Sequence, residues 1–187
     1  PIMPISAMMR IMESLVKEGK IKYIGVSNFN LDQVRKAQYS LRGEGLSCIE
    51  NEYSILQRSP ETNGLLRFCA ENKMTFVAYS PLAQGMLTGR YPSGFKAVRD
   101  LRRFTRVYSE EKLRRIAMLV DSLRMIGDKY GKSIGQVSLN WLIRDPMVIP
   151  IPGAKNAFQA EQNAESSGWR LSDSDWQAIE RTSRALD

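Results

Sequence analysis

Apolar and polar positions follow one another along this chain in a way that predicts short strands alternating with amphipathic helices. Apolar residues recur at helical spacing from Ile5 to Val16, and this first helix is expected to end at Gly19. Runs rich in Val, Ile, Tyr and Phe predict four strands, at 21–26, 46–53, 75–79 and 147–151.

Capping residues mark where the remaining helices begin. Asn30 followed by Gln33 predicts a helix through Leu41, and Ser133 with Gln136 predicts a second one that ends before Asp145-Pro146. Further helices are expected from Ser59-Pro60-Glu61 through Cys69, from Glu110 through Ile126, from Asn156, and from a Ser172 cap with Asp175. The segment 82–109 has no periodicity and is expected to be a long loop.

This alternation of strands and helices predicts a parallel sheet built from βαβ units. The strands read as apolar runs, so we expect both faces of the sheet to be covered. The pattern by itself does not separate an open doubly wound sheet from a closed barrel. No strand is followed by G-x-G-x-x-G, and G-x-x-x-x-G-K-[ST] is absent, so no Rossmann or P-loop motif is present.

Composition narrows the class of protein further. The 187 residues are 43% hydrophobic and 25% charged, which is typical of one globular domain. The longest uncharged stretch, 74–89, is too short and too polar to cross a membrane, and the N-terminus lacks the features of a signal peptide. Two cysteines, Cys48 and Cys69, build no disulfide framework, so a reducing, cytoplasmic location is expected. There is no histidine, which excludes imidazole catalysis and histidine zinc sites; we expect no metal.

The net charge of +7 comes mostly from one stretch, 96–115, with eight basic and three acidic residues. A flap that grips phosphate and a nucleic-acid contact are two functional interpretations. We favour a solvated loop and helix face, because a basic stretch without a recognised nucleic-acid module is weak support for nucleic-acid binding.

Candidate chemistry gathers where the predicted strands end, which is where parallel α/β folds bind ligands. The hydroxyl of Ser27 and the carboxamide of Asn28 suit an amide-bearing ligand, and Tyr79 offers a ring for stacking. Gly153 and Lys155, just before the helix start at Asn156, resemble an anion site. A cap, a turn or a core aromatic is the structural alternative for each.

Four stretches taken together resemble the aldo-keto reductase family, in the right order. They are GKIKYIGVSNFN (19–30), ENEYSIL (50–56), VAYSPLAQGMLTGRY (77–91) and VIPIPGAKN (148–156). The resemblance covers essentially the whole chain and is weakest at 95–107. It implies an α/β fold of the (β/α)8 TIM-barrel type, with residues 1–187 as a single partial domain that corresponds to the C-terminal half, strands 5 to 8.

The resemblance also implies an activity, the NADPH-dependent reduction of aldehydes or ketones to alcohols by hydride transfer. The family's catalytic Asp, Tyr, Lys and His match no residue here, so we expect the cofactor-binding half without catalytic residues. The expected partners are NADP(H) and, where the N-terminal half is present, a small carbonyl substrate. The alternative is a non-catalytic nucleotide-binding or interaction half-barrel, which pairs with another subunit as a homo-oligomer because four parallel strands leave two sheet edges.

The family motifs assign a role to each matching residue. Ser27 and Asn28 would hold the nicotinamide carboxamide, with Tyr79 stacked on the ring. The residues implied at the pyrophosphate are Ser80, Leu82, Gln84 and Leu87; those at the 2′-phosphate are Gly153, Lys155 and Gln159; those near the adenine are Gln162 and Asn163.

Two positions depart from the family pattern. Glu50 stands where a glutamine usually helps bind the carboxamide; a carboxylate accepts from the amide NH2 group but cannot donate to its carbonyl. Gln162 occupies a position often filled by glutamate, which leaves one adenine contact open.

Overall fold

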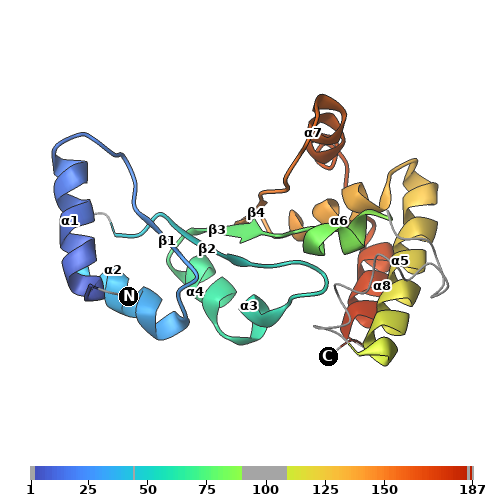
Figure 1. The fold of residues 1–187 in the computed structure, drawn as a ribbon, viewed down its shortest axis with the longest axis horizontal. Coiled ribbons are helices and arrows are strands. Elements are labelled where there is room, and N and C mark those ends of the chain that lie inside the picture. The colour runs from blue at the N-terminus through green and yellow to red at the C-terminus, as the bar shows by residue number, and fades with distance from the viewer. Residues whose placement is uncertain (1–2, 44, 90–108, 185, 187) are drawn as a thin grey trace. The chain divides into compact units, whose positions relative to one another are not determined.

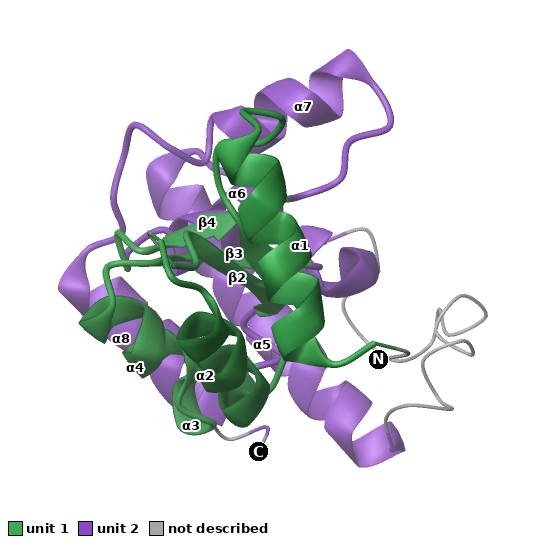
Figure 2. Ribbon diagram, turned by 90° about the vertical axis from the view of Figure 1, so that its left-hand side faces the viewer, with its two compact units in different colours: residues 1–53, 58–79, 145–151 green, residues 54–57, 80–144, 152–187 purple. Residues whose placement is uncertain are grey.

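The computed structural model describes residues 3–43, 45–89, 109–184 and 186 (Figure 1). They form two compact units, coloured separately in Figure 2. The first comprises residues 1–53, 58–79 and 145–151, and the second comprises 54–57, 80–144 and 152–187. The expectation of a single partial domain stays a prediction.

The first unit is built on a parallel sheet. Its described strands, in the order β1-β2-β3-β4, are β1 (Gly25–Ser27), β2 (Cys48–Glu52), β3 (Thr75–Tyr79) and β4 (Val148–Pro150). The parallel α/β class is therefore confirmed. The first strand begins at Gly25 rather than Ile21, because β1 lies at an edge of the described sheet and pairs only with β2 over these residues.

One face of the sheet is buried and the other is only partly buried. Val26, Ile49, Phe76 and Val148 stand opposite one another across the four strands, and each is at most 6% exposed. The row beside them ends in Ile149, which is 53% exposed. The prediction that both faces are covered therefore fails at the sheet's edge strands: side chains alternate between the faces, and on the second face Val77 is half-buried while Ser27 and Ile149 are exposed.

Helices of the first unit agree with the capping signals, with one exception. α1 (Ile5–Lys17) lies against α2 (Leu31–Ser40), which begins at the Asn30–Gln33 capping box (Figure 2). The helix expected from residue 59 to 69 is divided into α3 (Ser59–Thr62) and α4 (Leu65–Glu71). Gly64 separates them with φ 86°, a left-handed conformation that ends a helix.

The described part of the second unit holds a 3-10 segment and four helices. These are η1 (Ala83–Thr88), α5 (Glu110–Tyr130), α6 (Ile134–Leu142), α7 (Ala157–Ala164) and α8 (Asp173–Arg184). α5 packs on both α6 and α8 and buries Leu119 and Leu123, while α8 contributes Ile179. The expected long loop therefore contains a 3-10 segment, and its residues 90–108 lie outside the described part of the chain.

Two features of the described residues concern possible partners. Within them, no helix is long and apolar enough to cross a membrane. No group of three or more Cys, Asp or Glu side chains in the same residues is arranged to hold a metal ion.

Candidate functional site

The C-terminal ends of β1 and β3 are joined by a hydrogen bond between side chains. The hydroxyl of Tyr79 donates to Oδ1 of Asn28 over 2.8 Å. Asn28 adopts a left-handed conformation, φ 58°, and its backbone N–H donates to the Glu50 carbonyl over 2.9 Å. Asparagine tolerates this conformation better than most residues, so the backbone here turns the carboxamide toward Tyr79.

Ser27 and Glu50 complete a polar cluster at this sheet edge. Ser27 stands opposite Glu50 in the parallel register, and Nδ2 of Asn28 lies 3.4 Å from the Ser27 hydroxyl. Since Tyr79 already donates to Asn28 Oδ1, the NH2 group is the part of the Asn28 carboxamide that remains to donate, to Ser27 or to a ligand. The cluster thus combines a hydroxyl, an amide donor and a carboxylate acceptor, and Ser27 and Asn28 are both exposed.

Neither cysteine is a nucleophile candidate. Burial and the nearby charge of Glu50 raise the pKa of the Cys48 thiol. Burial raises the pKa of Cys69 to about 12, with smaller contributions from Asp145 and Cys48. Both thiols are free and stay protonated at neutral pH, so they are unreactive.

A second group of predicted residues forms the turn around η1. Ser80, Ala83 and Gln84 have φ values of 50°, 47° and 53°, which for residues other than glycine is strained backbone. The Ala83 N–H donates to Ser80 O over 2.9 Å. Leu87 has no exposed surface, so its side chain supports the turn from within the core and does not line a ligand surface in this conformation.

The third group lies at α7. The backbone N–H of Lys155 donates to Oε1 of Gln159 over 2.8 Å, and the N–H of Gln159 donates to Oδ1 of Asn156 over 2.9 Å. Nδ2 of Asn163 donates to Gly153 O over 3.3 Å. These bonds hold the loop against the helix N-terminus, where Lys155 is exposed and makes no ion pair with another described residue.

The structure therefore brings the predicted residues together in three groups. Ser27, Asn28, Glu50 and Tyr79 meet in the first unit. In the second unit, the residues predicted to lie at the pyrophosphate are in the turn around η1, and Gly153, Lys155, Gln159, Gln162 and Asn163 lie at α7.

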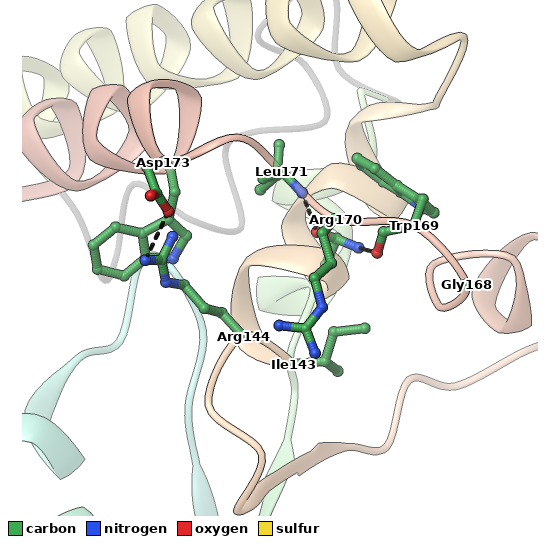
Figure 3. A pocket seen from close by; sticks show the side chains of 9 residues that line it. Ile143, Arg144, Gly168, Trp169, Arg170, Leu171 and Asp173 are labelled. Carbon is green, nitrogen blue, oxygen red and sulfur yellow. Dashed lines mark hydrogen bonds and ion pairs between the residues drawn. The ribbon is translucent and has the colours of Figure 1, made fainter.

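Sequence reasoning missed a pocket at the C-terminal end of α6. It has a volume of about 340 Å³, and its lining includes Arg144, Arg170 and Trp176 (Figure 3). The Arg144 guanidinium lies 4.4 Å from the centre of the Trp176 ring and 3.1 Å from Asp173. The amide of Asn140, which donates to the carbonyls of Ser166 and Trp169, holds the pocket wall. The arginine and tryptophan residues were its only sequence signal, and they follow no motif.

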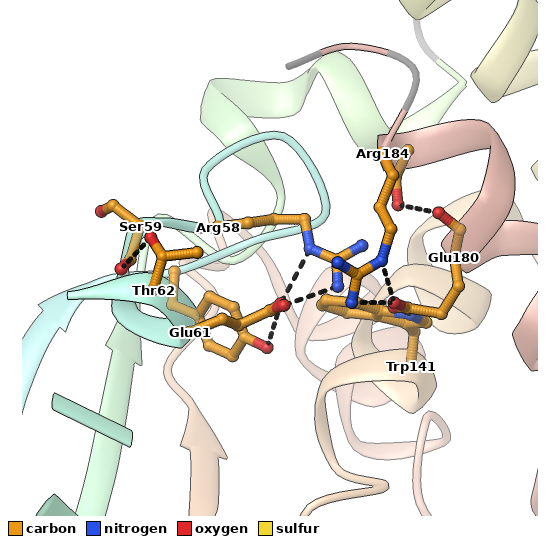
Figure 4. A network of polar contacts seen from close by, with 9 residues as sticks. Arg58, Ser59, Glu61, Thr62, Trp141, Glu180 and Arg184 are labelled. Atoms are coloured by element: carbon orange, nitrogen blue, oxygen red, sulfur yellow. Dashed lines mark hydrogen bonds and ion pairs between the residues drawn. The ribbon is translucent and has the colours of Figure 1, made fainter. Parts of the chain in front are cut away.

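Two ion-pair networks brace the units internally (Figure 4). In the first unit, Arg58 forms a fork to Glu61 with bonds of 2.8 and 2.7 Å, and Tyr53 donates to the same carboxylate. In the second unit, Glu180 accepts from Nε1 of Trp141 over 3.0 Å and from Arg184. The networks satisfy buried charges, so we assign them to stability.

The described end of the basic stretch is paired along its own helix. On α5, Arg115 lies 2.6 Å from Glu111, and Arg114 lies 3.9 Å from Glu110. This agrees with a solvated helix face. Residues 96–108, which carry most of the stretch, lie outside the described residues.

Comparisons with known proteins agree with this fold. The family model described as "Aldo/keto reductase family" matches residues 1–184. The aldo-keto reductase str7 of Strobilurus tenacellus is 33% identical over 97% of this chain and 54% of its own length. The NADH-specific methylglyoxal reductase of Escherichia coli is 31% identical over 98% of this chain and 55% of its own. The aldo/keto reductase of Klebsiella pneumoniae, solved with NADP and acetate, matches with a TM-score of 0.72 and 28% identity, over 96% of this chain and 54% of that one.

The chain belongs to the aldo/keto reductase family, which confirms the resemblance found in its sequence. Its parallel strands match part of the (β/α)8 barrel of that family's solved structures. The chain spans about half the length of the relatives it matches.

Proposed function

We propose that this chain is the cofactor-binding half of an NADPH-dependent aldo-keto reductase that reduces aldehydes or ketones to alcohols. The observation that carries the proposal is the hydrogen bond between Tyr79 and Asn28, which joins two strand ends at the edge where such barrels bind ligands.

The residues at this edge fit a nicotinamide carboxamide. The Ser27 hydroxyl and the Asn28 amide supply donors for its carbonyl, and Glu50 supplies an acceptor for its NH2 group. The Tyr79 ring, held by its hydroxyl, would stack on the nicotinamide. When bound, the cofactor supplies the hydride. Its ring would be oriented by Ser27, Asn28, Glu50 and Tyr79.

The α7 N-terminus fits the 2′-phosphate that distinguishes NADPH from NADH. Lys155 brings a positive charge, and the amide NH2 of Gln159 is a donor, because its carbonyl oxygen already accepts from Lys155 N–H. The turn at Ser80, Leu82 and Gln84 would hold the pyrophosphate. One relative is named NADH-specific, so membership of the family does not by itself decide between NADPH and NADH. The choice of NADPH therefore rests on the positive charge of Lys155.

Isothermal titration with NADPH and NADH tests this proposal. We expect NADPH to bind at least about tenfold more tightly than NADH, and Lys155→Met to remove that preference because it removes the cation. Lys36→Met, on an exposed position of α2, is the matched control and keeps the preference. Binding of neither dinucleotide would refute the proposed function, and equal binding would refute the choice of NADPH.

A turnover assay separates binding from catalysis. No residue here matches the family's catalytic Asp, Tyr, Lys or His, so NADPH oxidation with a reactive aldehyde should stay at background for this chain alone. Clear turnover would show that catalytic residues exist within these 187 residues.

The second candidate is a non-catalytic half-barrel that pairs with another subunit. It is favoured by Ile149 and Ile151, which are 53% and 45% exposed on an edge strand and just beyond it. Sedimentation velocity should then show a dimer that Ile149→Lys dissociates and that Ile11→Lys, at an exposed position of α1, leaves intact. A well-folded monomer would exclude this candidate. The cytoplasm remains the proposed location for both, because both cysteines are free.

A further inference from the structure

Three side chains, one on α6, one on α7 and one at the C-cap of α7, form a chain of hydrogen bonds that ends at a predicted adenine residue. Oε2 of Glu165 accepts from Nε2 of Gln136 over 2.9 Å and from Nε2 of Gln162 over 3.2 Å. All three belong to the second unit. Glu165 therefore connects the N-terminal turn of α6 to Gln162 on α7.

The direction of the Gln136–Glu165 bond agrees with the capping box of α6. The backbone N–H of Ser133 donates to Oε1 of Gln136 over 2.8 Å, as the capping box requires. Gln136 is 3% exposed, so its amide cannot turn without losing that bond. Its NH2 group must then face Glu165, and a carboxylate only accepts.

The same rule sets the orientation of Gln162. Glu165 has no proton to donate, so the amide of Gln162 turns its NH2 group toward the carboxylate. Its carbonyl oxygen is left over, with no hydrogen-bond partner among the described residues. A glutamine, which by itself offers a donor or an acceptor equally well, thus presents an acceptor.

We propose that Glu165 is a positioning residue that orients the Gln162 amide so that the cofactor site selects a 6-amino purine over a 6-oxo purine. The inference rests on the proposed function. An adenine amino group donates to the Gln162 carbonyl oxygen, whereas the 6-oxo group of hypoxanthine meets that oxygen with its own lone pairs.

The test compares the dissociation constants of NADPH and its hypoxanthine analogue by isothermal titration. The wild-type chain should prefer NADPH about fivefold to tenfold, the effect of one hydrogen bond. In Glu165→Ala the amide is free to turn, so the analogue should bind more tightly and the ratio should approach one. A purely structural role would weaken both dinucleotides equally.

Glu161→Ala is the matched control, since it makes the same change on the same helix at an exposed side chain. It should leave the ratio at the wild-type value. Gln162→Met removes the side-chain amide that would contact the purine and leaves Gln136 in place. It too should bring the ratio near one.

The outcomes separate this inference from the proposed function. A wild-type chain that binds NADPH but prefers neither purine refutes the inference alone. So does a ratio unchanged in Glu165→Ala or in Gln162→Met. A wild-type chain that binds neither dinucleotide refutes both the inference and the proposed function.

Discussion

The hydroxyl of Tyr79 donates to Oδ1 of Asn28 across 51 positions of sequence, over 2.8 Å. This one bond fixes the tilt of the aromatic ring and the direction of the carboxamide together. The ring is thereby oriented before any ligand arrives, which lowers the entropy cost of binding.

Tyr79→Phe keeps the ring and removes the bond. We expect the affinity for NADPH to fall about threefold to tenfold, because both the ring and the Asn28 amide become mobile. Isothermal titration measures the change, with Tyr39→Phe as the control at a tyrosine that is 93% exposed. An unchanged affinity in Tyr79→Phe would show that the hydroxyl does not organise the site.

Glu50→Gln tests the departure from the family pattern. The nicotinamide ring is cationic when oxidised and neutral when reduced, so a carboxylate beside it favours the oxidised form. The substitution should shift the ratio of the two dissociation constants by about threefold to tenfold in favour of NADPH over NADP+. Glu71→Gln makes the same charge change before β3 begins, at the opposite end of the strand, and should leave the ratio unchanged. Equal ratios in wild type and Glu50→Gln would place the carboxylate away from the ring.

Asp175 joins α8 to the end of α5. It accepts from Lys129 over 2.7 Å and from the Tyr130 hydroxyl over 2.8 Å, and these bonds, Lys129 first, hold the pKa of its carboxyl below the ordinary 3.8. The stabilisation is therefore complete above pH 3.8 and is lost as the pH falls through the lowered value. Asp175→Asn should cost about 1–3 kcal/mol at pH 7 and progressively less in acid.

Urea unfolding followed by tryptophan fluorescence measures this loss, since Trp141, Trp169 and Trp176 all lie in the same unit as Asp175. Asp173→Asn is the control: its side chain is 83% exposed, so its ion pair with Arg144 contributes less than about 1 kcal/mol. A pH-independent difference between wild type and Asp175→Asn would contradict the assignment.

Gly127 lies in the last turn of α5, and the residues that follow the helix hydrogen-bond back to it. A Cβ at this position would overlap the backbone carbonyl oxygen of Lys132, whose N–H donates to Gly127 O over 2.9 Å. Gly127→Ala should therefore destabilise the unit by about 1–3 kcal/mol, although alanine favours helices. Gly135→Ala, where the nearest atom would lie 3.9 Å away, should leave the urea midpoint unchanged or slightly raised. A stabilised Gly127→Ala variant would refute the close approach.

Local signals predicted the helices well because the groups that cap a helix are close in sequence. Asn30 with Gln33 and Ser133 with Gln136 each span three positions, and both capping boxes form. Strand lengths were predicted less well, since the extent of β1 depends on a partner strand rather than on its own residues. The exposed face at Ile149 was missed for the same reason, because packing on neighbouring elements decides it. The break at Gly64 was missed although it has a local cause, the left-handed backbone that glycine adopts readily.

The sequence by itself determined the family, the parallel α/β class and the residues that end each strand, because these depend on residue types at short and regular spacing. Only the tertiary structure decided how those residues meet. The Tyr79–Asn28 bond joins residues 51 positions apart, and the Gln136–Glu165 bond joins residues 29 positions apart. Such bonds form only when strand register and helix packing bring a donor within about 3 Å of an acceptor, and no local pattern encodes that distance.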